Sequence, residues 1–104
     1  MEKTLTSIQI DFNRAMKQAD RLDDLAYELT GVAQNQINGA MQEIHHSWTG
    51  EAAEQYLKKG QIIEKKVIQS ASQLKKIAAV IRTMATVTYN AELEAIRIAQ
   101  IREY

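Results

Sequence analysis

The residues best suited to chemistry lie near the middle of the sequence, where Glu43 and His46 stand three positions apart. On a helix this spacing places a carboxylate and an imidazole on one face, as in the E-x-x-H motif of di-iron four-helix proteins. Such a centre also needs a glutamate from each of two other helices. On the second half of the chain, no glutamate near this point falls on the expected apolar positions. A dimeric four-helix metalloenzyme is therefore the least favoured function for this chain.

Composition argues against other kinds of chemistry. The chain has 104 residues, no cysteine, and 13 basic against 13 acidic side chains, so its formal net charge is zero. Nucleic-acid binders usually carry a basic excess, and thiol or disulfide chemistry needs cysteine. The sequence contains neither a nucleophile elbow nor a phosphate-binding loop. We therefore expect no enzyme, no cofactor and no nucleic-acid partner.

The elements that carry these residues are expected to be helices. The chain has no proline and only 4 glycines, too few turn residues for a strand-rich fold. No apolar run approaches the roughly 18 residues of a transmembrane helix. The first residues, Met1 to Phe12, lack the basic-then-apolar layout of a signal peptide. The sequence predicts an all-α protein that is made and folded in the cytoplasm.

Apolar residues recur in alternating steps of three and four from Phe12 onward, which predicts a first helix over about 11–46. Leu5 to Ile10 are expected to be an extended lead-in, with Ser7 or Asp11 as the N-cap. Gln36 interrupts the pattern between Ala33 and Ala40. The expected seam of this helix consists of Phe12, Ala15, Ala19, Leu22, Ala26, Leu29, Ala33 and Ala40, with Met16, Ile37 and Ile44 beside it.

The same pattern predicts a second helix over about 51–100, after a turn at 47–50. Its expected seam consists of Ala53, Tyr56, Gly60, Ile63, Val67, Ser70, Leu74, Ile77, Ile81, Met84, Thr88, Ala91, Ala95 and Ile98. We therefore expect one domain, 1–104, that forms an antiparallel helical hairpin. Small residues on the first helix would admit larger ones from the second.

The hairpin also predicts a register and an overhang. Folding about Trp48 and Thr49 would bring Phe12 near Met84 and Ala33 near Ile63, and would leave residues 89–104 beyond the end of the first helix. A further apolar strip on the second helix lies off the seam and indicates a partner, with two hairpins forming a four-helix bundle. This strip includes Leu57, Ile68, Ala71, Ala78 and Val87.

The expected turn contains Trp48 and Gly50, and the chain has no other tryptophan. Glycine permits a positive φ, and the tryptophan ring could close the end of the apolar seam. A chain of about a hundred residues with W-x-G between two long helices resembles the WXG-hundred, or ESAT-six-like, family. Only Trp48 and Gly50 match a specific motif, although the resemblance covers essentially the whole chain.

The resemblance implies a function. Members are small helical hairpins that pair as homodimers or heterodimers, and type VII secretion systems export them without a signal peptide. Some accompany larger toxins or effectors as targeting partners. Many carry a Y-x-x-x-D/E signal after the second helix; here Tyr89 is followed by Glu92, one position early, with Leu93 in the fourth place. This departure implies either a variant signal or a partner that supplies the standard one, and an ordinary helix surface remains the alternative.

Three functions follow in order of preference. The first is a type VII secretion-associated protein, exported itself or serving as the targeting partner or chaperone of a larger effector. Its partner would be another helical hairpin or the helical N-terminal region of that effector, together with the secretion machinery. The second is a cytoplasmic coiled-coil adaptor, and the third is the metalloenzyme based on Glu43 and His46.

Overall fold

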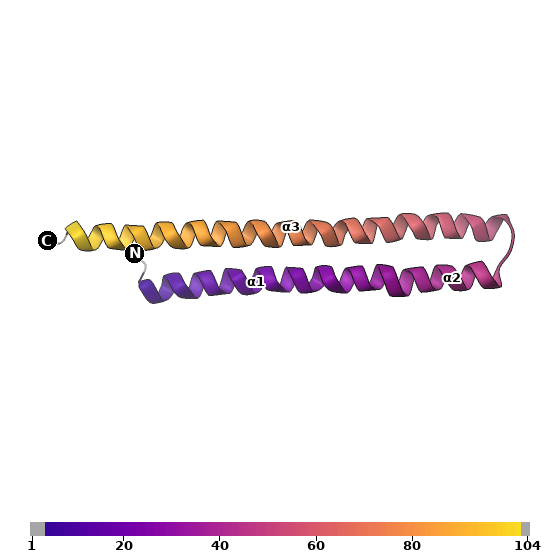
Figure 1. The fold of residues 1–104 in the computed structure, drawn as a ribbon, viewed down its shortest axis with the longest axis horizontal. Coiled ribbons are helices and arrows are strands. Elements are labelled where there is room, and N and C mark those ends of the chain that lie inside the picture. The colour runs from indigo at the N-terminus through magenta and orange to yellow at the C-terminus, as the bar shows by residue number, and fades with distance from the viewer. Residues whose placement is uncertain (1–3, 103–104) are drawn as a thin grey trace. The chain divides into compact units, whose positions relative to one another are not determined.

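The computed structural model describes residues 4–102, and these residues form an all-α fold. The elements are α1 (Leu5–Gly31), a π-helical segment η1 (Val32–Ile37), α2 (Asn38–Ser47) and α3 (Glu51–Arg102). Backbone conformation is helical on both sides of η1, so the first three elements follow one another without a loop. As Figure 1 shows, only the short segment between α2 and α3 reverses the chain. The predicted antiparallel helical hairpin is confirmed.

Helix α1 begins earlier than the sequence analysis predicted. The Thr4 hydroxyl accepts a hydrogen bond from the backbone N–H of Ser7 at 3.1 Å, as an N-cap residue does. The N–H of Ile8 bonds to the Thr4 carbonyl at 3.0 Å, and the Ile8 side chain is only 2% exposed. The expected lead-in at 5–10 is therefore the first part of the helix, because a cap and a buried apolar side chain both stabilise it.

The π-helical segment η1 explains the gap at Gln36. If the three-and-four pattern continued from Ala33, it would place Gln36 and Ala40 on the inner face, yet both are exposed. Because a π-turn holds more residues than an α-turn, the inner face advances by one position. The half-buried side chains in the rest of η1 and α2 are Ile37, Met41 and Ile44, and Gly39 between them is half-buried as well.

The chain reverses at Gly50, whose φ of +106° is the one positive φ among residues 4–102. Trp48 is extended, and its N–H donates to the Ile44 carbonyl at 2.9 Å, which closes α2. The N–H of Glu54 donates to the Gly50 carbonyl at 3.2 Å at the start of α3. Glu51 and Glu54 in this first turn have the charge that a helix N-terminus favours.

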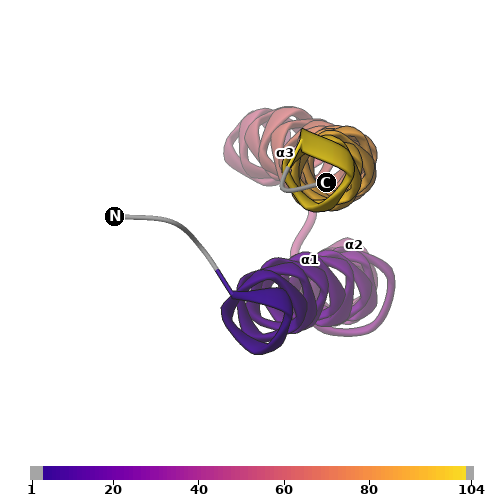
Figure 2. The same cartoon turned by 90° about the vertical axis from the view of Figure 1, so that its left-hand side faces the viewer.

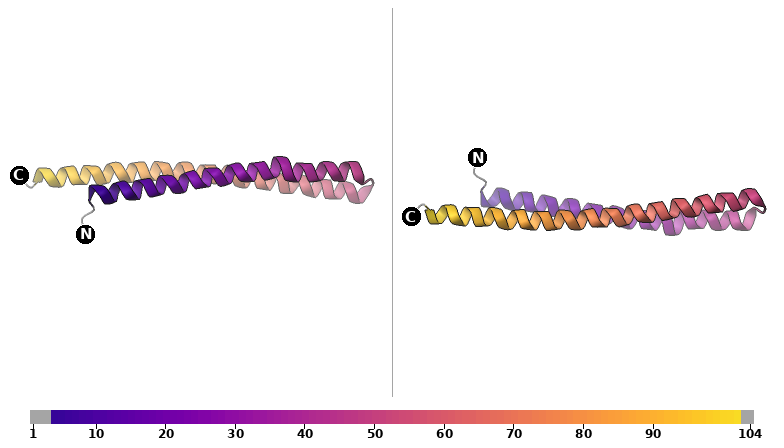
Figure 3. Two further views of the ribbon diagram at one scale, coloured as in Figure 1. Left: turned by 90° about the horizontal axis from the view of Figure 1, so that it is seen from below. Right: turned by 90° about the horizontal axis from the view of Figure 1, so that it is seen from above.

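The helices form two compact units. The terminal unit pairs α1 up to Leu22 with α3 from Lys76, and the loop unit runs from Asp23 to Lys75. In each unit the two parts of the chain run antiparallel, and Figures 2 and 3 show them from one end and from two further sides.

The pairing register differs from the predicted one. In the terminal unit, Phe12 stacks on Tyr89 rather than on Met84, with ring centroids 4.7 Å apart. In the loop unit, Met41 lies so close to Gly60 that a Cβ added there would be 2.6 Å from its sulfur. Both pairs lie about five residues further along α3 than predicted. The cause is the turn, which pivots at Gly50 instead of at Trp48 and Thr49.

The inner face of α3 also differs from the predicted seam. At every second seam position, the residue that packs inward is the one that follows the predicted residue in the sequence. Of the predicted seam, Phe12, Leu22, Leu29, Val67, Leu74 and Ile81 are half-buried, whereas Ile63, Ile77 and Met84 are exposed. The positions one residue later, Leu57, Glu64, Ala71, Ala78 and Ala85, are buried or half-buried instead. Three of these, namely Leu57, Ala71 and Ala78, were expected in the further apolar strip that lies off the seam. At Ala78 an alanine takes the place of the predicted isoleucine on the inner face, because facing alanines allow the helix backbones to approach closely.

The fully buried side chains of the described residues are therefore mostly small. On α1 and η1 they are Ile8 and three alanines spaced by seven, Ala19, Ala26 and Ala33, and on α3 they are Ala53, Ala71 and Ala78. No helix in the described part of the chain is long and apolar enough to cross a membrane.

Candidate functional site

The W-x-G loop presents an aromatic pair. The Trp48 side chain is 52% exposed, so the expectation that its ring would be buried at the end of the seam is corrected. Its ring packs edge-on against the ring of Tyr56, with centroids 5.6 Å apart. Tyr56, which was expected in the seam, is 55% exposed. The loop thus holds two aromatic side chains in a defined contact while leaving about half of each open to a partner.

The geometry of this pair depends on the short loop. The hydrogen bond from Trp48 to Ile44 ends α2, and the positive φ of Gly50 lets α3 begin at the next residue. Tyr56 lies in the second turn of α3 and meets the Trp48 ring from there. Residues with a Cβ rarely adopt such a φ, so the glycine is required by the backbone rather than by a lack of space around it.

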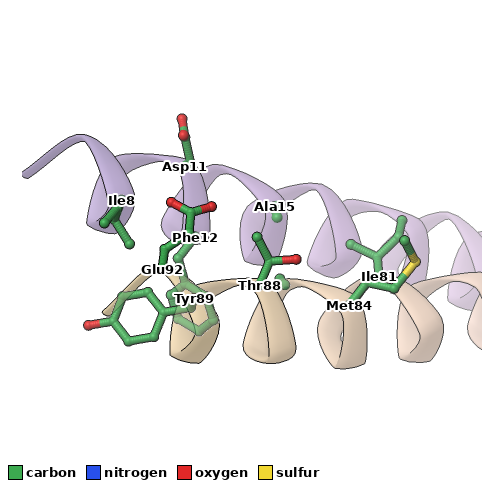
Figure 4. Close-up of a pocket in the computed structure, with 10 residues that line it drawn as sticks. Ile8, Asp11, Phe12, Ala15, Ile81, Met84, Thr88, Tyr89 and Glu92 are labelled. Carbon is green, nitrogen blue, oxygen red and sulfur yellow. The ribbon is translucent and has the colours of Figure 1, made fainter. Parts of the chain in front are cut away.

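Tyr89 and Glu92, the candidate secretion signal, lie in the terminal unit on the α3 face that packs against α1. Figure 4 shows both side chains beside Phe12, with Glu92 pointing from α3 toward α1. Both residues are half-buried, and one carboxylate oxygen of Glu92 is hidden from solvent. The pair is therefore part of a helix–helix contact. The expected overhang from residue 89 is corrected to a shorter one, because α1 starts at Leu5 and packs against Tyr89 and Glu92, while the end of α3 runs past the start of α1 (Figure 1).

A groove of about 290 Å³ runs along this contact. Apolar side chains from both helices form most of it, and the polar residues Asp11, Thr88 and Glu92 also line it. Its walls are Ile8, Asp11, Phe12 and Ala15 from α1, and Ile81, Met84, Ala85, Thr88, Tyr89 and Glu92 from α3 (Figure 4). Sequence reasoning missed this groove since it treated the first residues of α1 as an extended segment. Ile8, which is one of the walls of the groove, is buried because these first residues are helical and not extended.

Ion pairs lie on the surface of the terminal unit, and those of Arg82 and Arg97 are well defined. Arg82 of α3 donates to the Asp20 carboxylate of α1 at 2.7 Å, which links the two helices. Further along α3, the Arg97 guanidinium donates to both carboxylate oxygens of Glu94. This hydrogen bonding lowers the pKa of Glu94 and raises the pKa of Arg97. Both groups are solvent-exposed, so the pair orders one helix surface and adds little to stability.

The E-x-x-H motif lies near the C-terminal end of α2, on the surface of the helix. Glu43 and His46 are both exposed on α2. Glu64 is half-buried on the rotated inner face of α3, which corrects the expectation that no glutamate would lie on it near the turn. Even so, among residues 4–102 no three side chains of His, Cys, Asp or Glu gather closely enough to hold a metal ion.

Comparison of this chain with models of known families, with curated proteins and with solved structures finds no match.

Proposed function

We propose that this chain is a small interaction protein of a type VII secretion system, exported itself or acting as the targeting partner of a larger effector. The support is a W-x-G motif that forms the reversing loop of an antiparallel helical hairpin. Its partner would be a second helical hairpin or the helical N-terminal region of the effector. Export would follow folding in the cytoplasm and would need no signal peptide.

The observation that carries the proposal is the half-exposed Trp48 ring. A tryptophan whose purpose is to close the seam would be buried against both helices, because burying its apolar area is what would stabilise the fold. Here the ring is 52% exposed and braced by Tyr56. Exposed and rigidly held aromatic side chains are typical anchors of protein interfaces. The loop therefore suits recognition by the secretion machinery or by the partner.

The C-terminal half of α3 supports a second recognition element. Tyr89 is held by its ring contact with Phe12, and Glu92 points from the same face of α3 toward α1. A receptor reading these residues would meet them as part of a folded helix pair. The variant spacing of the signal, Tyr89 to Glu92, still places both residues on one face of the helix, as the standard spacing would.

A coiled-coil adaptor that stays in the cytoplasm is the second candidate. It is favoured by the many large apolar side chains exposed on α3, among them Ile63, Ile77 and Val80. An adaptor needs such surface as much as a secreted protein does. The two candidates differ in whether the chain leaves the cell.

Export can be tested with Trp48→Ala in a Gram-positive host that carries a type VII system. Tyr27→Ala is the matched control, since Tyr27 is an aromatic residue on α1 with 80% exposure. We expect the wild-type chain and Tyr27→Ala in the medium, and Trp48→Ala retained in the cell with unchanged helical content. Absence of the wild-type chain from the medium would favour the adaptor. Export of Trp48→Ala at the wild-type level would remove Trp48 from the recognition site.

A further inference from the structure

The second half of α3 carries an additional heptad pattern that the hairpin does not use. Its apolar residues follow steps of three and four from Ile77 to Ile101, and one polar residue, Glu94, interrupts them. The large apolar members are between 42% and 63% exposed. We name this surface the outer stripe, and its members are Ile77, Val80, Met84, Val87, Ala91, Glu94, Ile98 and Ile101.

The outer stripe lies beside the face that contacts α1, and Met84 belongs to both because it also lines the groove between the two helices. That face carries Ala78, Ala85 and Glu92, each one position away from a stripe residue and rotated by about 100° around the helix. The stripe begins at Ile77, because the equivalent positions before it, Lys59, Lys66 and Gln73, are polar. It spans about 36 Å at 1.5 Å per residue. A sustained seam of this length is the pattern by which one helix pairs with another.

The charges beside the outer stripe indicate which helix fits. The residues at its flanking positions are Lys76, Thr83, Asn90 and Arg97 on one side and Ile81, Thr88, Ala95 and Arg102 on the other. All the charged flanking residues are thus cations, namely Lys76, Arg97 and Arg102. The single acid within the stripe, Glu94, is already bound by Arg97. In coiled coils the flanking positions choose the partner by opposite charge.

A second copy of this chain fits the stripe poorly. Two parallel copies would place Glu94 opposite Glu94 and Arg97 beside Arg102 of the other copy. Two antiparallel copies that overlap along the whole stripe would place Lys76 beside Arg97 of the other copy. Like charges at these positions destabilise pairing.

We propose that the outer stripe binds an amphipathic helix of a different protein, one with apolar residues at heptad spacing and acidic residues at the flanking positions. This inference deepens the proposed interaction role by naming the chemistry of the partner, and it does not depend on export. Binding would bury the six large apolar side chains of the stripe, and Lys76 and Arg102 would meet carboxylates.

The test uses the full chain and two designed helical peptides of about four heptads. Both carry leucine at the seam positions; one has glutamate at the flanking positions and the other has lysine there. We expect fluorescence anisotropy to show binding of the glutamate peptide and about tenfold weaker binding of the lysine peptide, since Lys76 and Arg102 would then repel the peptide instead of attracting it. Raising the salt concentration should narrow this difference.

Variants locate the binding surface. Val87→Glu should abolish binding of the glutamate peptide, because it places a charge in the middle of the stripe. Thr86→Glu is the matched control, since Thr86 is exposed on α3 but lies outside both the stripe and the face toward α1. Equal binding of the two peptides, or unchanged binding to Val87→Glu, would overturn the proposal.

The oligomeric state of the isolated chain shows whether the outer stripe binds a different protein or a second copy of this chain. We expect sedimentation to show that Val87→Glu does not change the association state of the chain. A dimer that Val87→Glu dissociates would identify a second copy as the occupant and would overturn the heterotypic assignment. Failure of export with intact peptide selectivity would count against the secretion role and leave the outer stripe in place.

Discussion

The ring of Phe12 stacks on the ring of Tyr89 at a centroid distance of 4.7 Å, with the two planes inclined by 39°. This contact joins the N-terminal part of α1 to the C-terminal half of α3, and it forms a wall of the groove that also contains Glu92. A residue of the candidate export signal is thereby coupled to the stability of the terminal unit. Substitutions at Tyr89 that affect export therefore have to be compared with substitutions at Phe12.

Removing either ring should destabilise the protein. We expect Phe12→Ala and Tyr89→Ala each to lower the free energy of unfolding by roughly 1–2 kcal/mol, from lost apolar burial. A double-mutant cycle should give a coupling of about 0.5–1.5 kcal/mol. Urea unfolding followed by circular dichroism measures these values. Tyr27→Ala, at an 80% exposed aromatic, should change stability by less than about 0.5 kcal/mol. Additive effects would show that the rings do not interact.

Enlarging a buried alanine should be costly. Ala26 is fully buried in the loop unit, so Ala26→Leu forces the helix backbones apart and should destabilise the protein by roughly 1–3 kcal/mol. Ala40→Leu is the control in the same unit, because Ala40 is exposed on α2 and leucine is a good helix former. Thermal unfolding of both variants checks the prediction. Equal melting temperatures would contradict the close alanine packing.

The π-helical segment should behave as a one-residue insertion. Deleting Gln36 would bring Ile37, Met41 and Ile44 to regular heptad spacing after Ala33, so we expect helical content and melting temperature to be unchanged or higher. Deleting Lys17 from regular α-helix is the comparison, since every residue on one side of the deletion would rotate by about 100° off its face. That variant should unfold at a lower temperature. Equal losses in the two deletions would argue against a π-turn.

Two glycines should respond oppositely to alanine. Gly39 lies within α2 and an added Cβ would meet only open space there, so Gly39→Ala should stabilise the protein by about 0.5–1 kcal/mol. Gly50 has a φ of +106°, so Gly50→Ala should destabilise it by roughly 1–2 kcal/mol through backbone strain. Chemical denaturation measures both changes. Stabilisation by Gly50→Ala would show that the loop does not need the positive φ.

The Glu94–Arg97 pair should be visible in a pH titration. Hydrogen bonding from Arg97 lowers the pKa of Glu94, so Arg97→Gln should raise that pKa toward the value of an ordinary glutamate. A group whose pKa is lowered by folding contributes stability above its unfolded pKa and loses it as the pH falls through the folded value. The side-chain carboxyl shift of Glu94 in NMR reports this titration. An unchanged pKa in Arg97→Gln would rule out the pairing in solution.

Much of the fold follows from local rules of the sequence. Helix formers without proline predict two long helices, and the repeat of Ala19, Ala26 and Ala33 every seven residues predicts the inner face of the first one. The sequence also predicts the turn between the two helices, because glycine at position 50 can adopt the positive φ that is found there. These features depend on the residues themselves or on near neighbours.

Long-range packing decides the rest. On α3 both Ile77 and Ala78 fit a heptad pattern, and hydrophobicity favours the isoleucine, yet Ala78 is buried and Ile77 is exposed. Which of the two residues is buried depends on how closely the helix backbones approach. That distance is a property of the two helices together and not of either helix by itself. The register, set by the pivot at Gly50, likewise brought Tyr89 to Phe12 rather than leaving it in an overhang. Spacing along one helix contains no information about the distance to the other, and that distance selects the buried face.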